Sequence, residues 1–169
     1  DEKERAIQEA SKKIAEAEEV LNELNEDKED AENLLLIFRT AAKSNNFEQI
    51  YGTEEKIFKK YYGEAEYEKH KKEVEYSRKS LLRAREDYRN RVAAQTEEGP
   101  LSPAEEATYK RAIEDGEDAF ADLTKKDNEL TNAIWDYYNA INSNKDIDKT
   151  YEALFSLLYP EDDKKEKLI

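Results

Sequence analysis

The sequence predicts an all-α fold: an elongated, antiparallel three-helix bundle with up-down-up topology and coiled-coil-like packing. Three observations predict it. Apolar residues recur at alternating intervals of three and four residues, which is the spacing of a coiled-coil seam. Charged residues make up 41% of the chain and apolar residues 37%, which suits long helices with much surface and little core. Only 4 Gly and 3 Pro are present, so few helix breakers interrupt the pattern.

The first predicted helix runs from about residue 2 to residue 43 and has the most regular seam. Its seam positions are Ile7, Ala10, Ile14, Ala17, Leu21, Leu24, Lys28, Ala31, Leu35, Phe38 and Ala42. Only Lys28 breaks the apolar series. A stripe this narrow cannot stabilise a lone helix, so other helices must cover it. Residues 44–46 are turn formers that end this helix, and a connector containing Tyr51 follows.

The later helices are placed by their start and stop signals. The second runs from about 54 to 96, with Thr53 as its N-cap and a kink or register change near Gly63. The third runs from about 103 to 142 and opens with the capping box of residues 102–105. A short fourth helix, about 148–159, stops before Pro160. We therefore predict a bundle over 1–144, a short helix within 145–160, and a charged tail or the start of a following segment over 161–169.

An antiparallel register predicts that the aromatic residues collect at one end of the bundle, where the short fourth helix packs. These residues are Phe38, Phe47, Tyr51, Phe58, Tyr61, Tyr62, Trp135, Tyr137, Tyr138, Tyr151 and Phe155. The other end is predicted to be rich in alanine, with Ala10, Ala93, Ala94, Ala104 and Ala107. Gly63 falls opposite Trp135, so its missing side chain is expected to make room for the indole.

The aromatic end has two interpretations. It is a wide core capped by the fourth helix, or some of its side chains stay exposed to anchor a partner, since Tyr and Trp are enriched at binding hot spots. Tyr51, Tyr62 and Tyr138 are the candidates because each flanks a seam position, and Trp135 joins them. Both interpretations can hold for different residues.

A polar layer is predicted in the middle of the bundle, from Lys28, His70 and Lys126. Its simplest role is to fix the register of the helices at some cost in stability. A pH-responsive switch at His70 is the alternative.

Composition argues against several classes of function. The net charge of −14 disfavours nucleic acid and anionic membranes as partners, and no apolar run is long enough to span a bilayer. With no Cys, one His and no Gly-rich phosphate loop, we expect no enzyme, no cofactor and no metal site. Residues 142–148 resemble a calcium loop, but Ile147 and Ala153 replace its Gly and Glu, so a turn is predicted.

Acidic residues also gather between Glu114 and Asp122. A solvated helix face is the expected explanation, and a basic partner or a cation is the alternative. The chain begins at Asp1 and contains no Met, so we expect a mature or excised fragment without its targeting segment.

Charged long helices without Cys or Met, with strict heptads and a Tyr-rich end, resemble the helical ectodomains of Gram-positive surface proteins of the streptococcal adhesin and M-like class. The resemblance implies an extracellular or cell-wall-associated adhesin or virulence-factor domain that binds a host extracellular or plasma protein. A monomer is expected, and a dimer if one apolar stripe is left over. The alternatives are a spectrin-like spacer and a helical domain of a bacteriocin or secretion-system protein.

Overall fold

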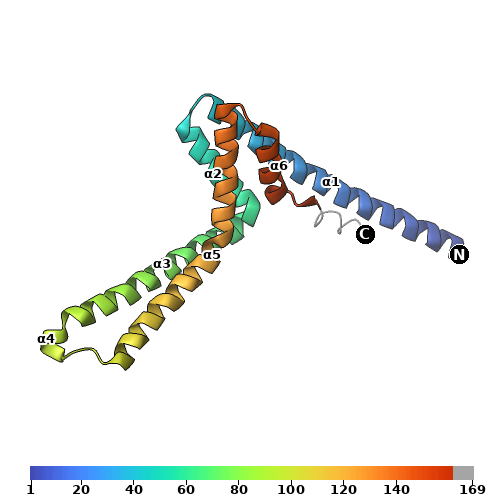
Figure 1. Cartoon of the computed structure of the whole chain (residues 1–169). Coiled ribbons are helices and arrows are strands. Elements are labelled where there is room, and N and C mark those ends of the chain that lie inside the picture. Colours follow the sequence, from blue (N-terminus) through green and yellow to red (C-terminus); the bar gives the residue numbers. More distant parts are fainter. Residues whose placement is uncertain (162–169) are drawn as a thin grey trace. The chain divides into compact units, whose positions relative to one another are not determined.

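A computed structural model describes residues 1–161, and every regular element in that range is an α-helix (Figure 1). The helices are α1 (Glu2–Lys43), α2 (Phe47–Tyr62), α3 (Glu64–Ala93), α4 (Gln95–Glu98), α5 (Pro103–Ser143) and α6 (Ile147–Leu158). The all-α prediction is confirmed. The predicted tail lies, from residue 162 on, outside the described residues.

The helices group into two compact units. Unit 1 comprises Asp1–Gly63 and the chain from Leu130 onward, and unit 2 comprises Glu64–Glu129. Helix α5 contributes to both. This grouping differs from the predicted division at residue 144, because α6 supplies Leu154 and Leu158 to the same core as α1 and α2.

Helix α1 has the predicted bounds. The Asp1 carboxylate caps it by accepting from the backbone N–H of Lys3, at 3.2 Å. Its buried positions begin at Leu24 and continue along the seam to Ala42. The expectation that the whole seam is covered does not hold in unit 1, where the seam residues before Leu24 are exposed.

Helix α2 begins earlier than the sequence suggested. Asn46 is its N-cap and accepts from the backbone N–H of Gln49 at 3.2 Å. The predicted cap, Thr53, is instead buried within the helix, and its hydroxyl donates to the Gln49 carbonyl at 2.7 Å. The prediction of a connector up to Thr53 was wrong because an asparagine amide caps a helix at least as well as a threonine hydroxyl.

The predicted second helix is divided at Gly63, near which a kink or register change was expected, into α2 and α3, and its last residues belong to the short α4. Gly63 has φ +87°, and its N–H donates to the Lys59 carbonyl at 2.8 Å, which ends α2. A Cβ at position 63 would have no atom within 4 Å, so the expectation that Gly63 makes room for Trp135 was wrong. Glycine is needed here for its positive φ.

Of the predicted aromatic end, Phe38 and Tyr137 are buried in the core of unit 1, and most of the other rings are partly buried beside that core, on which α6 also packs. Phe38 and Tyr137 stack with ring centroids 5.8 Å apart, and Leu154 of α6 is fully buried in the same cluster. The other buried members are Ala31, Leu35, Ala41, Ala42, Ile50, Ile57, Leu130, Ile134, Ile141, Leu158 and Tyr159.

Unit 2 contains α3, α4 and the first part of α5. The predicted start of α5 is confirmed: the Ser102 hydroxyl accepts from the Glu105 N–H at 3.1 Å, and Pro103 is the first helical residue. Leu81 is buried against Gly116, at which a Cβ would lie 3.2 Å from the Leu81 Cδ1 atom. Tyr88 stacks on Tyr109 at 5.8 Å.

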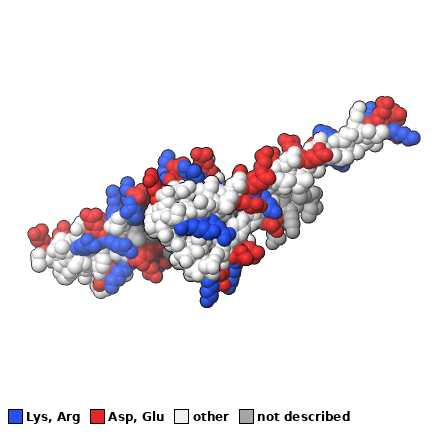
Figure 2. Space-filling model, turned by 90° about the horizontal axis from the view of Figure 1, so that it is seen from above, with Lys and Arg blue, Asp and Glu red and all other residues white. Residues whose placement is uncertain are grey.

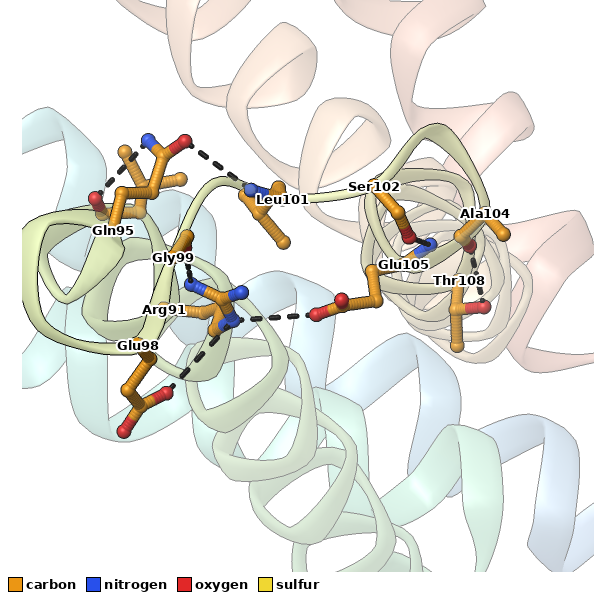
Figure 3. Close-up of polar contacts among 10 residues, drawn as sticks. Arg91, Gln95, Glu98, Gly99, Leu101, Ser102, Ala104, Glu105 and Thr108 are labelled. Atoms are coloured by element: carbon orange, nitrogen blue, oxygen red, sulfur yellow. Dashed lines mark hydrogen bonds and ion pairs between the residues drawn. The ribbon is translucent and has the colours of Figure 1, made fainter.

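Polar contacts, rather than alanine packing, organise the turn between α3 and α5 (Figure 3). The Arg91 guanidinium donates to the Gly99 carbonyl at 3.0 Å and to the Glu105 carboxylate at 3.3 Å. The backbone N–H of Leu101 donates to the side chain of Gln95. The five alanines of the predicted alanine-rich end form no buried core within either unit: Ala94 is half-buried, and the others, Ala10 in unit 1 and Ala93, Ala104 and Ala107 in unit 2, are exposed.

Candidate functional site

Four aromatic side chains meet on the surface of unit 1. Phe47 and Tyr51 come from α2, and Trp135 and Tyr138 come from α5; we call them the aromatic quartet. Ring centroids are 6.4 Å apart for Phe47–Tyr51, 6.0 Å for Tyr51–Trp135, 5.1 Å for Trp135–Tyr138 and 6.3 Å for Tyr138–Phe47. Each ring therefore contacts two others in a closed circuit, at separations typical of attractive aromatic pairs.

Helix periodicity and one turn place these rings together. Phe47 and Tyr51 are four residues apart on α2, and Trp135 and Tyr138 three apart on α5, so each pair shares a helix face. The Tyr138 hydroxyl donates to the Asn45 side-chain oxygen at 3.2 Å. Asn45 lies in the turn before α2 with φ +51°, so the quartet is tied to the entry of that helix.

The quartet is open to solvent on its α2 side. Phe47 is 48% and Tyr51 57% exposed, while Trp135 and Tyr138 are half-buried. The residues just before the two α5 members, Ile134 and Tyr137, are buried in the core. An aromatic surface on a rigid, buried base is the composition that protein interfaces favour.

A carboxylate lies behind this surface. Glu54 follows Tyr51 on α2 and accepts a hydrogen bond from the Trp135 side chain. Its Oε2 atom is buried and has no hydrogen-bond partner among the described residues. Burial raises the pKa of Glu54, and the bond from Trp135 opposes that rise.

Three of the four predicted aromatic anchors belong to the quartet. The fourth, Tyr62, does not, because it lies at the end of α2 with its ring edge-on to Tyr61 at 4.9 Å. Phe47 was assigned to the aromatic end but not to the anchors. Its four-residue spacing from Tyr51, after the cap Asn46, is the signal that could have found it.

The predicted polar layer is not brought together within either unit. Lys28 is in unit 1, exposed beside a hollow between α1 and α6 that Tyr151 and Phe155 also line. His70 and Lys126 are in unit 2, where the His70 Nε2 atom lies 2.8 Å from the Asp127 carboxylate and Lys126 is exposed. The carboxylate partner of His70 was not anticipated.

Other acidic and polar stretches match their simpler interpretations. The acidic residues from Glu114 to Asp122 are exposed on α5, and Glu117 pairs with Arg85 at 3.3 Å. Residues 142–148 form the end of α5, a turn with positive φ at Asn144 and Asp146, and the start of α6. Figure 2 shows acidic and basic side chains interleaved on the face it displays.

Over residues 1–161, no group of three or more acidic or histidine side chains is arranged to hold a metal ion. None of the helices in that range has both the length and the apolar character needed to cross a membrane.

No protein-family model, curated protein or solved structure matches the chain.

Proposed function

We propose that the chain is a non-enzymatic interaction module that binds a protein partner through the aromatic quartet. The observation that carries this proposal is the exposure of Phe47 and Tyr51 within a closed circuit of rings that includes Trp135. Large aromatic side chains contribute much of the binding energy at interfaces. Anchoring on two helices and on Asn45 holds the rings in place before binding, so little side-chain entropy is lost when a partner docks.

The resemblance to streptococcal surface proteins extends the proposal to the partner and the place. We propose display outside the cell, on the wall or secreted, and a host extracellular or plasma protein as the ligand. The proposal does not depend on the up-down-up packing of the three long helices, which stays a prediction from the heptad pattern.

A structural spacer is less well supported than a binding module. A spacer would bury its aromatic side chains, whereas the Phe47 and Tyr51 side chains of the quartet are each about half exposed. A bacteriocin or secretion-system domain has no observation that favours it over the binding module.

The test begins with affinity capture on the immobilised chain from plasma and extracellular-matrix extract, followed by measurement of Kd for the purified ligand. Phe47→Ala and Tyr51→Ala are each expected to weaken binding about tenfold or more, as truncation of an aromatic hot spot does. Tyr76→Ala is the matched control, because Tyr76 is largely exposed but belongs to unit 2. The chain has one Trp, so a ligand at the quartet should also change Trp135 fluorescence.

Two results would contradict the proposal. One is a ligand whose Kd is unchanged in both quartet variants, or rises as much in Tyr76→Ala as in the quartet variants. The other is a recovered ligand that the chain cleaves or modifies, which mass spectrometry of the ligand before and after incubation would show.

A further inference from the structure

The first half of α1 is a helix with an exposed apolar stripe. Residues 2–19 are all exposed, and burial in α1 starts only at Leu24. Ile7 is 66%, Ile14 60% and Leu21 48% exposed. Long helices with one narrow apolar stripe gain most of their stability from a packed partner, so this segment is suited to pair with another helix.

The spacing of the stripe specifies the kind of partner. Ile7, Ile14 and Leu21 are seven residues apart, the a positions of a heptad, and Ala10 and Ala17 are its d positions. In parallel coiled coils, isoleucine at a together with leucine at d favours two strands. Here Ile7 and Ile14 supply that a-position preference, and the d positions hold the smaller Ala10 and Ala17. In a parallel pair, a second copy of this helix would place its a and d residues level with the same residues of the first.

The charges beside the stripe favour a second copy in parallel. Lys13 is at a g position and Glu18 at the following e position, so each Lys13 faces Glu18 of a second copy. An antiparallel pair with Ile14 against Ala10 would place Lys13 near Lys13 and Glu4 near Glu18, which repel.

We propose that residues 7–21 of α1 pair with the same residues of a second copy as a short, parallel, two-stranded coiled coil. Three large apolar side chains per copy bury less than the roughly 1,200–2,000 Å² of a standard interface. The dimer is therefore weak and reversible, with a Kd above about 1 µM. The pairing segment contains no member of the aromatic quartet, so this inference stands or falls independently of the proposed function.

Sedimentation equilibrium of the full chain, from about 1 µM to about 1 mM, tests the pairing over the range of weak affinities. We expect a reversible dimer that Ile14→Asp weakens about tenfold or more, since a charge in the seam has no partner. Leu36→Asp is the matched control, because Leu36 is equally exposed on the same helix but off the seam. Lys13→Glu should weaken the dimer, and adding Glu18→Lys should restore it.

Orientation is tested by a single thiol, since the natural chain contains no Cys. In a parallel pair, Ala10→Cys places two thiols across one d layer, within the Cα separation of about 4.4–6.8 Å that a disulfide needs. We expect rapid oxidation to a covalent dimer, and much slower oxidation in the Ala10→Cys, Ile14→Asp double variant.

Three results would overturn the inference. A monomer over the whole concentration range excludes the pairing. A monomer whose urea midpoint falls with Ile14→Asp shows that the stripe is covered within one chain. An Ile14-dependent dimer that Ala10→Cys does not cross-link excludes the parallel orientation.

Discussion

Gly52 and Gly63 form a matched pair in which only the backbone differs. A Cβ added at either position would have no atom within 4 Å. Gly52 lies inside α2, whereas Gly63 ends it with φ +87° and ψ 145°. Alanine at the two sites should therefore change the free energy of unfolding in opposite directions.

The expected sizes follow from the two backbone conformations. Gly52→Ala should stabilise by about 0.8–1 kcal/mol, the difference in helix propensity between the two residues. Gly63→Ala should destabilise by about 1–3 kcal/mol, because residues with a Cβ rarely adopt that φ and ψ. The two variants should thus differ by about 2–4 kcal/mol.

Urea unfolding followed by Trp135 fluorescence measures both effects, since Trp135 and the two glycines all belong to unit 1. The midpoint should rise for Gly52→Ala and fall for Gly63→Ala with an unchanged m-value. If Gly63→Ala were as stable as the natural chain, residue 63 would be helical. The break between α2 and α3, and the reasoning that gives Gly63 its role, would then be refuted.

Three further substitutions test packing and electrostatics by urea unfolding. Gly116→Ala should gain less stability than Gly52→Ala, because the Leu81 Cδ1 atom lies 3.2 Å from the new Cβ and must shift. Glu54→Gln should raise the urea midpoint at pH 7, because burial raises the pKa of Glu54 in the folded state. The folded chain then binds the proton more tightly than the unfolded chain, so the natural chain loses stability as the pH rises from 4.5 through the raised pKa. Phe38→Ala should cost about 3–5 kcal/mol, as truncation of a fully buried phenylalanine does.

For each of these three predictions, one result would contradict it. If Gly52→Ala and Gly116→Ala stabilised the chain equally, Leu81 would not contact the α5 backbone at residue 116. An advantage of Glu54→Gln that persists unchanged below pH 4.5 would show that the buried charge is not its cause. A loss under 1 kcal/mol for Phe38→Ala would place Phe38 outside the core, against its complete burial.

The sequence predicted the bounds of α1, α5 and α6 to within one or two residues because strong local signals mark their ends. Ser102 and Pro103 open α5, and the turn residues 44–46 close α1. The start of α2 was missed because Gly52 and Thr53 together look like a helix start. A single glycine is tolerated inside a helix at a cost of about 1 kcal/mol, and the earlier cap at Asn46 prevails.

The division into two units lay beyond the heptad pattern. A seam indicates which face of a helix is apolar, but not which helix covers that face. Residues 7–21 and 31–42 therefore have similar patterns in sequence, although only the second stretch has buried seam residues. The positions flanking a seam, which lie at the border between core and solvent, included Tyr51 and Tyr138 of the quartet but also Tyr62, which lies outside it. The meeting of the quartet in one surface depends on α2 starting at Phe47.

Unit 1 is discontinuous in sequence, since all of unit 2 lies between its two parts. During synthesis, Phe38 and Ile57 therefore emerge well before Tyr137 and Leu154, with which they share a core. Unit 2 is continuous in sequence, so we expect its hairpin to fold before unit 1 is assembled. Its ends are side by side, as the 2.8 Å contact between His70 and Asp127 shows. Once the hairpin has folded, the loop that must close to assemble unit 1 is about tenfold shorter. The entropic cost of bringing the two parts of unit 1 together then falls by about 2 kcal/mol.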